Sequence, residues 1–458
     1  MKKTNGKKAE KNLEVINPHA AGIDIGSKQH YVAVSSEKTS KPIREFGTTT
    51  AELKSIVSWF KAIGVTTVAM ESTGIYWICL YDMLESHGIE VYLVNARHTK
   101  NVSGRKTDVS DCEWIRKLHS YGLLSRSFIP NDLIRKLQSY VRQRETMETQ
   151  KAIDITKIGT VLHKMNIKLQ NIVSDLEGMV AMNIIRDISA GACVGEELVN
   201  QYWTKQMKAS REEAILSLQG NYREDNLFIL EQALSSYDFH KSKMLECDKR
   251  IEDILRQMQA ISNHIQTEKE QVVERVEITK KKGKRRKNEL SFDAREYLRA
   301  IAGVDLIAVD GFEVNTVLTI ISEVGTDLSK FKTKKQFTSW LRLAPNAKIS
   351  GGRIIGYQKN TTSSRASKAF RLSARSLHSS KSPLGEMYRR ISARKGPAVA
   401  IKAIARKLAI IYYVMITTGS EYKKENSLDL ELKNEKRMIK NIETKAKKLG
   451  YELVKKAS

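Results

Sequence analysis

The sequence predicts a mixed α/β N-terminal domain, a long helical coiled-coil arm, and a mainly α C-terminal domain. Short apolar runs alternate with helical patterns up to residue 111, and apolar residues then recur at spacings of three and four. A strongly basic run precedes the last block of helices. The expected boundaries are 1–14 for a flexible basic tail, 15–130 for the α/β domain, 131–279 for the arm, 280–290 for a basic linker, 291–419 for the C-terminal domain and 420–458 for a basic helical tail.

The charge of the chain is its most informative bulk property. The 78 Lys and Arg residues exceed the 52 Asp and Glu residues, which gives a formal charge of +26. A protein this basic usually binds a polyanion. Aromatic residues make up only 7% of the chain. We therefore expect Lys and Arg to contact a nucleic-acid backbone, in preference to a broad platform for base stacking.

Cysteine, histidine and hydropathy patterns exclude several classes of protein. The four cysteines show no C-x-x-C spacing and the nine histidines form no H-x-x-x-H pair, which argues against a zinc site and for a reducing compartment. No apolar run reaches the roughly 18 residues of a membrane span. The sequence thus predicts a cytoplasmic, nucleoid-associated protein.

The first strand signal contains an isolated acid. Residues 20–27 and 31–35 read as two strands of a hairpin, with Asp24 between apolar neighbours. A carboxylate at such a position is costly to bury unless a cation neutralises it, so Asp24 is a candidate metal ligand. The same segment also resembles the phosphate loop of actin-like ATPases and sugar kinases, which is the alternative interpretation.

A second acid follows the next predicted strand. Residues 51–64 have a helical pattern, residues 65–70 form a buried-strand run, and Glu71 comes directly after it. A helix near 75–85 and a third strand at 89–94 complete an α/β alternation. A carboxylate at the end of a strand and before a helix has the position of an active-site group in an α/β sheet.

Two further acids, Asp108 and Asp111, lie three residues apart on one predicted helix. That spacing puts both carboxylates on one helix face, where a divalent cation would relieve their repulsion. A solvated helix surface is the alternative. The order Asp24, Glu71, Asp108, Asp111 resembles the acids of the junction-resolvase branch of the ribonuclease-H-like fold. Such a set can hold two divalent ions, and oxygen ligands favour Mg²⁺.

The arm has two apolar seams of about three heptads each. The first runs from Ile155 to Leu176 within a helical stretch at 133–176, and the second runs from Met244 to Ile261. They predict either an antiparallel helical hairpin or a coiled coil between subunits. A structural spacer and a nucleic-acid-binding arm both remain open. The basic run 280–287, with seven cations in eight residues, is either a phosphate-binding segment or only a linker.

The C-terminal block is predicted to contain helices at 297–304, 314–324, 337–343 and 401–415, with a loop at 346–353. Ser350 precedes two glycines in that loop, which allows its hydroxyl to be exposed and a phosphate to approach the backbone. An ordinary surface loop is the alternative to a nucleophilic serine. The neighbouring cations are Lys348, Arg353, Lys359, Arg365, Lys368 and Arg371.

Several motifs together resemble one family, the DEDD insertion-sequence transposases, also called bridge-RNA-guided recombinases. The N-terminal motifs are Gly22-Ile-Asp24, Met70-Glu-Ser-Thr-Gly-Ile-Tyr-Trp77, Gly104-Arg-Lys-Thr-Asp-Val-Ser-Asp111 and Leu118-His-Ser-Tyr-Gly-Leu-Leu124. The later motifs are Tyr222-Arg-Glu-Asp225, Leu227-Phe228, Ser339-Trp340, Leu343-Ala-Pro-Asn346 and Lys348-Ile-Ser-Gly-Gly352. One departure is Ile301-Ala-Gly-Val-Asp305, where the family usually has a proline before the glycine.

The resemblance implies a RuvC-like N-terminal domain in which Asp24, Glu71, Asp108 and Asp111 bind Mg²⁺. It also implies that Ser350 attacks DNA to form a covalent phosphoserine, at a site composed from different subunits of a homodimer or homotetramer. Donor DNA, target DNA and a guide RNA are the implied partners. The expected nucleic-acid contacts add Arg105 and Lys106 to the cations named above.

Two other functions are compatible with these residues. In a junction-type nuclease, water attacks the phosphate and Ser350 is only a loop residue. In a non-catalytic nucleic-acid-binding scaffold, the four acids are structural.

Overall fold

The computed structural model contains two compact units, residues 1–129 and 130–458, which we describe separately. None of the helices it describes is long and apolar enough to cross a membrane. The described residues are 14–95, 108–191, 195–204, 207, 209–268, 287–345, 347–357, 364–423, 439, 442–444, 446–452 and 454. The predicted basic N-terminal tail, nearly all of the 280–287 run and most of the predicted C-terminal tail therefore lie outside the description.

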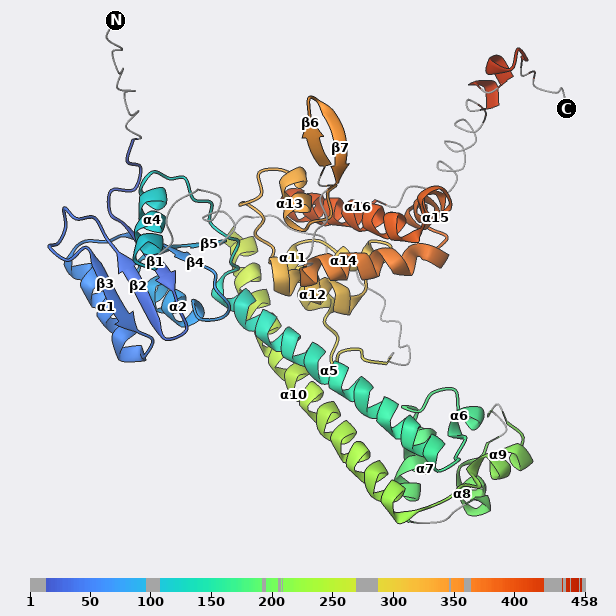
Figure 1. The fold of residues 1–458 in the computed structure, drawn as a ribbon. Helices are drawn as coiled ribbons and strands as arrows, with labels where there is room; N and C mark the ends of the chain where they lie inside the picture. Colours follow the sequence, from blue (N-terminus) through green and yellow to red (C-terminus); the bar gives the residue numbers. More distant parts are fainter. Residues whose placement is uncertain are drawn as a thin grey trace, which may run out of the picture. The chain divides into compact units, whose positions relative to one another are not determined.

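A five-stranded sheet organises the first unit, in the order β3-β2-β1-β4-β5 (Figure 1). β1 is antiparallel to β2, which is antiparallel to β3, whereas β1, β4 and β5 are parallel. This mixed sheet is consistent with the predicted ribonuclease-H-like fold. The strands are β1 (Ala20–Ile25), β2 (Gln29–Ala33), β3 (Ile43–Gly47), β4 (Thr67–Glu71) and β5 (Glu90–Val94).

One face of the sheet is covered by α1 (Thr50–Ala62) and α2 (Ile78–Ser86). Thr49 caps α1, since its side chain accepts a hydrogen bond from the Glu52 amide. The apolar sides of both helices pack against the odd-numbered residues of β1 and against the neighbouring side chains of β4 and β5 on the same face of the sheet. The core on this face includes Ile23, Met70, Leu93, Ile56, Phe60, Leu80 and Leu84.

The other face is covered by α4 (Asp108–Ser120), whose backbone lies directly on β1. A Cβ added to Gly22 would stand 2.3 Å from the Arg116 amide nitrogen and 2.4 Å from the Cys112 carbonyl oxygen. Further along the helix, the buried His119 ring lies 2.9 Å from the Thr67 hydroxyl of β4. Glycine at position 22 therefore allows the helix to pack this closely.

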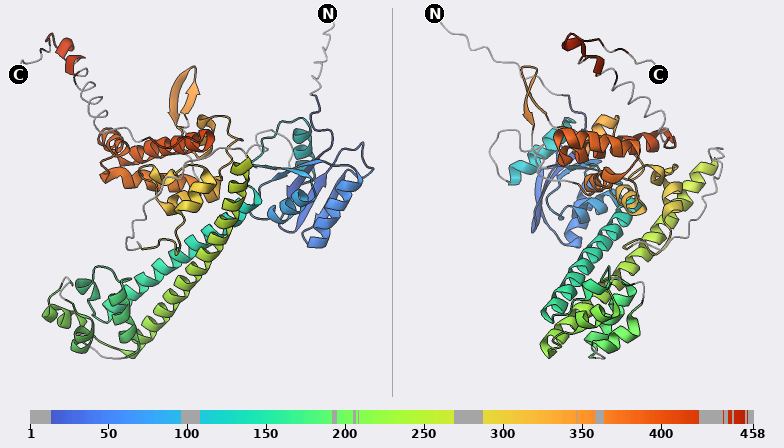
Figure 2. Two further views of the ribbon diagram at one scale, coloured as in Figure 1. Left: turned by 180° about the vertical axis from the view of Figure 1, so that it is seen from behind. Right: turned by 90° about the vertical axis from the view of Figure 1, so that its right-hand side faces the viewer.

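In the second unit, α5 (Asp132–Lys164) and α10 (Glu224–Glu268) lie side by side along their lengths in the views of Figures 1 and 2. They are antiparallel, because Arg144 pairs with Asp248 and Asp154 pairs with His240. The predicted antiparallel hairpin is thus present within one chain. The far end of the pair carries α6 (Leu169–Ile172), α7 (Met179–Ser189), α8 (Glu196–Tyr202) and α9 (Arg211–Leu218).

The stretch 133–176 is largely helical, as predicted, but it is interrupted near its C-terminal end. α5 ends at Lys164, and Asn166 turns the chain with a φ of +59°. The later seam residues Leu169 and Ile172 remain buried, but in the core of the small helices and not along a continuing helix. The spacing of the apolar residues still identified the buried positions, because residues after the short turn direct their apolar side chains into the core.

The C-terminal part of the second unit is mostly helical. Its last helix, α16 (Pro397–Thr418), contains the helix predicted at 401–415 and packs against α13, α14 and α15. The buried Tyr412 hydroxyl donates to the Gly325 carbonyl at 2.8 Å. The other elements are α11 (Arg295–Ala302), η1 (Leu306–Ala308), α12 (Val314–Val324), α13 (Lys334–Trp340), β6 (Ala347–Ser350), β7 (Arg353–Tyr357), α14 (Arg365–Ser376), η2 (Leu377–Ser379) and α15 (Pro383–Lys395).

Gly22→Ala is expected to displace α4 from the sheet. The added methyl group has no flexible side chain to push aside, only backbone, so we expect a loss of about 1–3 kcal/mol in the stability of the first unit. Hydrogen–deuterium exchange of peptides covering 108–120 should accelerate. Gly356→Ala is the control, since nothing lies within 4 Å of its added Cβ. Unchanged exchange in the Gly22 variant would contradict the close packing.

The first unit is expected to lose stability as the pH falls below about 6.5. Burial lowers the pKa of His119 to about 4, so between these pH values the unfolded chain binds a proton that the folded chain does not. The penalty for His119 alone should reach about 2 kcal/mol at pH 5. Urea unfolding at pH 7 and pH 5 measures it. In His119→Asn the difference between the two pH values should shrink by that amount; an equal difference in both proteins would refute the assignment.

Candidate active site

Asp24 and Glu71 occupy neighbouring positions at the carboxyl ends of two parallel strands. The register pairs Gly22 with Ala69 and Ile23 with Met70, so the next pair along the strands is Asp24 and Glu71. Side chains of paired residues point to the same face of a sheet, and this face is the one that α4 covers. Both acids are half-buried. The structure thus brings together the two strand-end acids that the sequence singled out.

The direction of α4 places its first turn beside these acids. His119, near the end of the helix, contacts Thr67 at the start of β4, whereas Cys112 lies over Gly22 in the middle of β1. The beginning of α4, with Asp108 and Asp111, therefore lies toward the carboxyl ends of β1 and β4. Asp111 is half-buried.

The Cys112 thiol on α4 is affected both by burial and by the charge of Asp24. Burial raises the pKa of Cys112 to about 12, and the negative charge of Asp24 contributes to the rise. Cys112 is accordingly a neutral packing residue and not a nucleophile at neutral pH.

Carboxylate oxygens from β1, β4 and α4 are the donor type that hard divalent cations such as Mg²⁺ prefer. Their chemical kind suits a metal at this end of the sheet. Among the side chains that the structure describes, however, no three His, Cys, Asp or Glu residues are grouped so as to hold a metal ion. The Asp108 side chain, and the whole of Arg105 and Lys106, lie outside the described residues.

Ser350 lies at the tip of a β-hairpin, where the sequence predicted a loop. Gly351 and Gly352 form a two-residue turn with φ of +53° and +76°, a geometry that glycine adopts without strain. Ser350 pairs with Arg353 across this turn. The two side chains therefore lie on the same face of the hairpin.

The hairpin has one polar, cationic face and one apolar face. Lys348 shares the face of Ser350 and Arg353, because it is two residues from Ser350 along β6. The paired Ile349 and Ile354 lie on the other face and are 66% and 58% exposed. Ser350, Lys348 and Arg353 are also exposed. The hydroxyl of Ser350 is thus accessible beside two cations.

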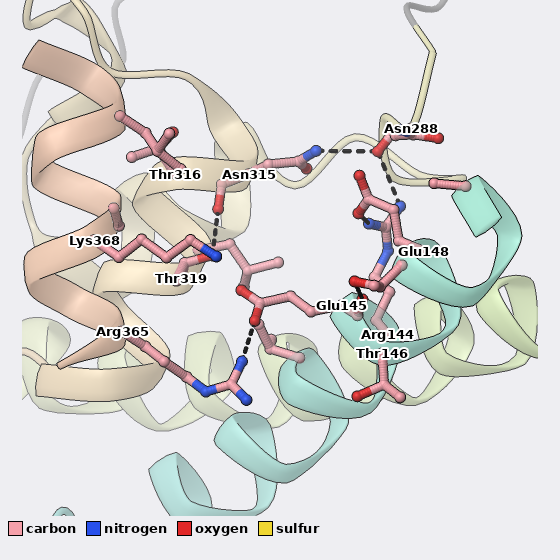
Figure 3. A pocket seen from close by; sticks show the side chains of 16 residues that line it. Arg144, Glu145, Thr146, Glu148, Asn288, Asn315, Thr316, Thr319, Arg365 and Lys368 are labelled. Carbon is pink, nitrogen blue, oxygen red and sulfur yellow. Dashed lines mark hydrogen bonds and ion pairs between the residues drawn. The ribbon is translucent and has the colours of Figure 1, made fainter. Parts of the chain in front are cut away.

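The remaining predicted cations belong to another element. Arg365, Lys368 and Arg371 are exposed residues of α14, and Arg365 forms an ion pair with Glu145 of α5. Arg365 and Lys368 line a pocket together with residues of α5 and α12 (Figure 3). Lys359 lies outside the described residues.

Two features of the site escaped the sequence interpretation. The seating of α4 on Gly22 was not predicted, although the glycine two residues before Asp24 on a strand was a signal for close backbone approach. The hairpin had a clearer signal, since the Gly-Gly pair is flanked by Lys348-Ile-Ser and Arg353-Ile-Ile, the pattern of a two-residue hairpin turn.

Comparisons with known proteins identify the family of the chain. A model of the DEDD transposases of the IS110 type matches residues 21–167, the stretch that contains all four acids. A second model, described as "Transposase IS116/IS110/IS902 family", matches residues 305–389, which include the Ser350 hairpin. A search of curated proteins returned no match. The two family matches together cover about half of the 458 residues, in the order of the family. The chain belongs to the IS110 family of DEDD transposases, enzymes that act on DNA.

Proposed function

We propose that this transposase cuts and rejoins DNA with two sets of groups, the acids Asp24, Glu71, Asp108 and Asp111 and the hydroxyl of Ser350. The observation that carries the proposal is the placement of Asp24 and Glu71 side by side at the strand ends, with the first turn of α4 toward the same end. Acids on three separate elements are otherwise expected to avoid one another, because their like charges repel.

The four acids are proposed to hold Mg²⁺. DEDD transposases normally use a divalent metal, and the oxygen donors here fit one. When bound, the ion would polarise the scissile phosphate and stabilise the charge on the departing oxygen. The half-burial of Asp24, Glu71 and Asp111 supports this role, because it leaves each carboxylate partly accessible while the sheet and α4 fix its position.

Ser350 is proposed as the nucleophile. Its oxygen forms a bond to phosphorus, the phosphorus–oxygen bond to one deoxyribose breaks, and the proton lost by the serine balances the one gained by the released DNA hydroxyl. The hydroxyl of a new DNA partner then reverses the step. One phosphodiester bond is kept as a serine ester throughout, so the reaction needs no ATP.

The setting of Ser350 supports this role over that of an ordinary loop residue. A two-glycine turn removes side-chain bulk next to the hydroxyl, and nothing lies within 4 Å of a Cβ added at Gly351 or Gly352. Arg353 across the strand pair and Lys348 on the same face offer donors for phosphate oxygens.

Donor and target DNA are the proposed substrates, with a structured guide RNA as a further partner. We also propose that the enzyme works as a homodimer or homotetramer, with acids and serine contributed by different subunits and with α5 and α10 as a coiled-coil arm. Association with the nucleoid follows from DNA binding. The proposed backbone contacts are Arg105, Lys106, Lys348, Arg353, Lys359, Arg365, Lys368 and Arg371.

Ser350→Ala should abolish a covalent protein–DNA adduct. End-labelled donor DNA, Mg²⁺ and the RNA transcribed from the element's flank are incubated with each protein and resolved on a denaturing gel. Loss of the nucleophile should reduce strand cleavage by at least about 1,000-fold. Ser339→Ala, at another exposed serine of the same unit, should retain the labelled band. Magnesium-dependent cleavage that survives Ser350→Ala without an adduct would replace serine chemistry with attack by water.

Asp111→Asn should lower magnesium-dependent cleavage by at least about 100-fold, because the amide keeps the shape of the side chain but loses its charge. Glu113→Gln is the matched control, since Glu113 is an exposed acid on the same helix and one charge is removed in each case. Both variants are assayed over a titration of Mg²⁺. Equal activity in the two variants would exclude Asp111 from the metal site.

A further inference from the structure

A polar pocket in the 130–458 unit has no assigned role. It measures about 710 Å³ and lies between α5, α12 and α14, with Asn288 at one end (Figure 3). That volume is in the range of small-ligand sites, about 300–1,000 Å³. Its walls differ in chemistry, and the difference restricts what it can bind.

Of the two arginines that line the pocket, Arg144 forms ion pairs and hydrogen bonds within the protein. Arg144 of α5 is only 7% exposed, and its guanidinium pairs with the fully buried Asp248 of α10. It also donates to the Asn288 carbonyl at 3.1 Å. Because its donors are used internally, Arg144 holds the base of the pocket in place and does not supply the charge that a ligand would meet.

The α14 wall presents donors. Arg365 and Lys368 are three residues apart and therefore share a helix face, and both extend into the pocket in Figure 3. Arg365 is held by its ion pair with Glu145 across the opening. The side chain of Lys368 makes no hydrogen bond or ion pair with another described residue, so its ammonium group is available to an anion.

The α5 wall presents acceptors. The hydroxyl of Thr146 donates to the Arg142 carbonyl at 3.0 Å, and that of Thr149 donates to the Glu145 carbonyl at 2.8 Å. A hydroxyl has one proton, so both threonines have only lone pairs left for a ligand. The Glu148 carboxylate on the same wall is also an acceptor; one of its oxygens receives an N–H from Arg144 at 3.4 Å, which leaves further lone pairs for a ligand.

We propose that this pocket holds one unpaired nucleotide of a nucleic-acid strand. The phosphate binds Lys368 and Arg365, and the hydrogen-bond donors of the sugar or base bind the threonines and Glu148. A simple anion would fit only the α14 wall and would be repelled by Glu148, whereas a nucleotide carries an anion at one end and donors at the other. The inference rests on the proposed nucleic-acid function and adds a strand-binding site that shares no residue with the four acids or Ser350.

The test measures binding of fluorescein-labelled single strands of about 12 nucleotides, as RNA and as DNA of the same sequence, to the full chain at about 150 mM salt by anisotropy. Lys368→Ala should weaken binding about tenfold. Lys335→Ala, at an exposed lysine of α13 that does not line the pocket, should change it less than about twofold. Thr149→Val, which keeps the shape but removes the acceptor, should weaken binding about fivefold, and Thr149→Ser should restore it.

The outcomes separate the possible ligands. A Thr149→Val loss with RNA only would assign the α5 wall to the ribose 2′-hydroxyl, and a loss with both strands would assign it to the base; either supports the proposal. Equal effects of the two lysine variants, or a Lys368→Ala effect without any from Thr149→Val, would overturn it. The readout is equilibrium binding without strand cleavage, so failure of the serine mechanism does not affect this test.

Discussion

The packing of α4 directly on β1 is the constraint on which the candidate active site depends. Because Gly22 has no side chain, the helix backbone reaches the strand, and the turn before Cys112 comes to the level of the strand ends. His119 holds the other end of the helix through the Thr67 hydroxyl. The carboxylates need not bind one another, since the sheet and helix fix them against their mutual repulsion. Carboxylates from three elements can stay close together only if the packing of those elements contributes enough free energy to offset their electrostatic repulsion.

A high positive charge does not mean that every cation is available for nucleic acid. Arg144 pairs with Asp248, and Lys151 pairs with Glu177 at 3.1 Å, with all four side chains nearly buried. The first pair joins the antiparallel helices, and the second joins α5 to the segment between α6 and α7. Arg144 also donates to the Asn288 carbonyl. Exposed cations such as Lys368 and Arg353 take no part in these buried ion pairs. The net charge of +26 therefore predicts the class of partner, whereas only the local partners of each side chain predict where contact occurs.

The sequence predicted the strands and helices that carry the acids because each had a strong local signal, with Asp24 inside one apolar run and Glu71 at the end of another. It missed β3, an edge strand whose half-exposed residues alternate poorly. The seam predicted for α5 continued past Asn166. A single residue with left-handed backbone angles ends the helix there, but the spacing of the buried positions is kept. The pocket beside α14 could not be predicted, since it depends on contacts between residues more than two hundred positions apart, such as Glu145 and Arg365.

The hairpin determines where Ser350, the proposed nucleophile, is presented. Two strands alone are marginally stable in water, and here the pairing continues from Ser350 and Arg353 to Ala347 and Tyr357 through a bulge on β7. The turn fixes which residues share a face, so Ser350 and its cations cannot exchange places with the isoleucines without a register shift. The chemistry proposed for Ser350 therefore depends on the register of a short ribbon, whereas that of the acids depends on a packed sheet.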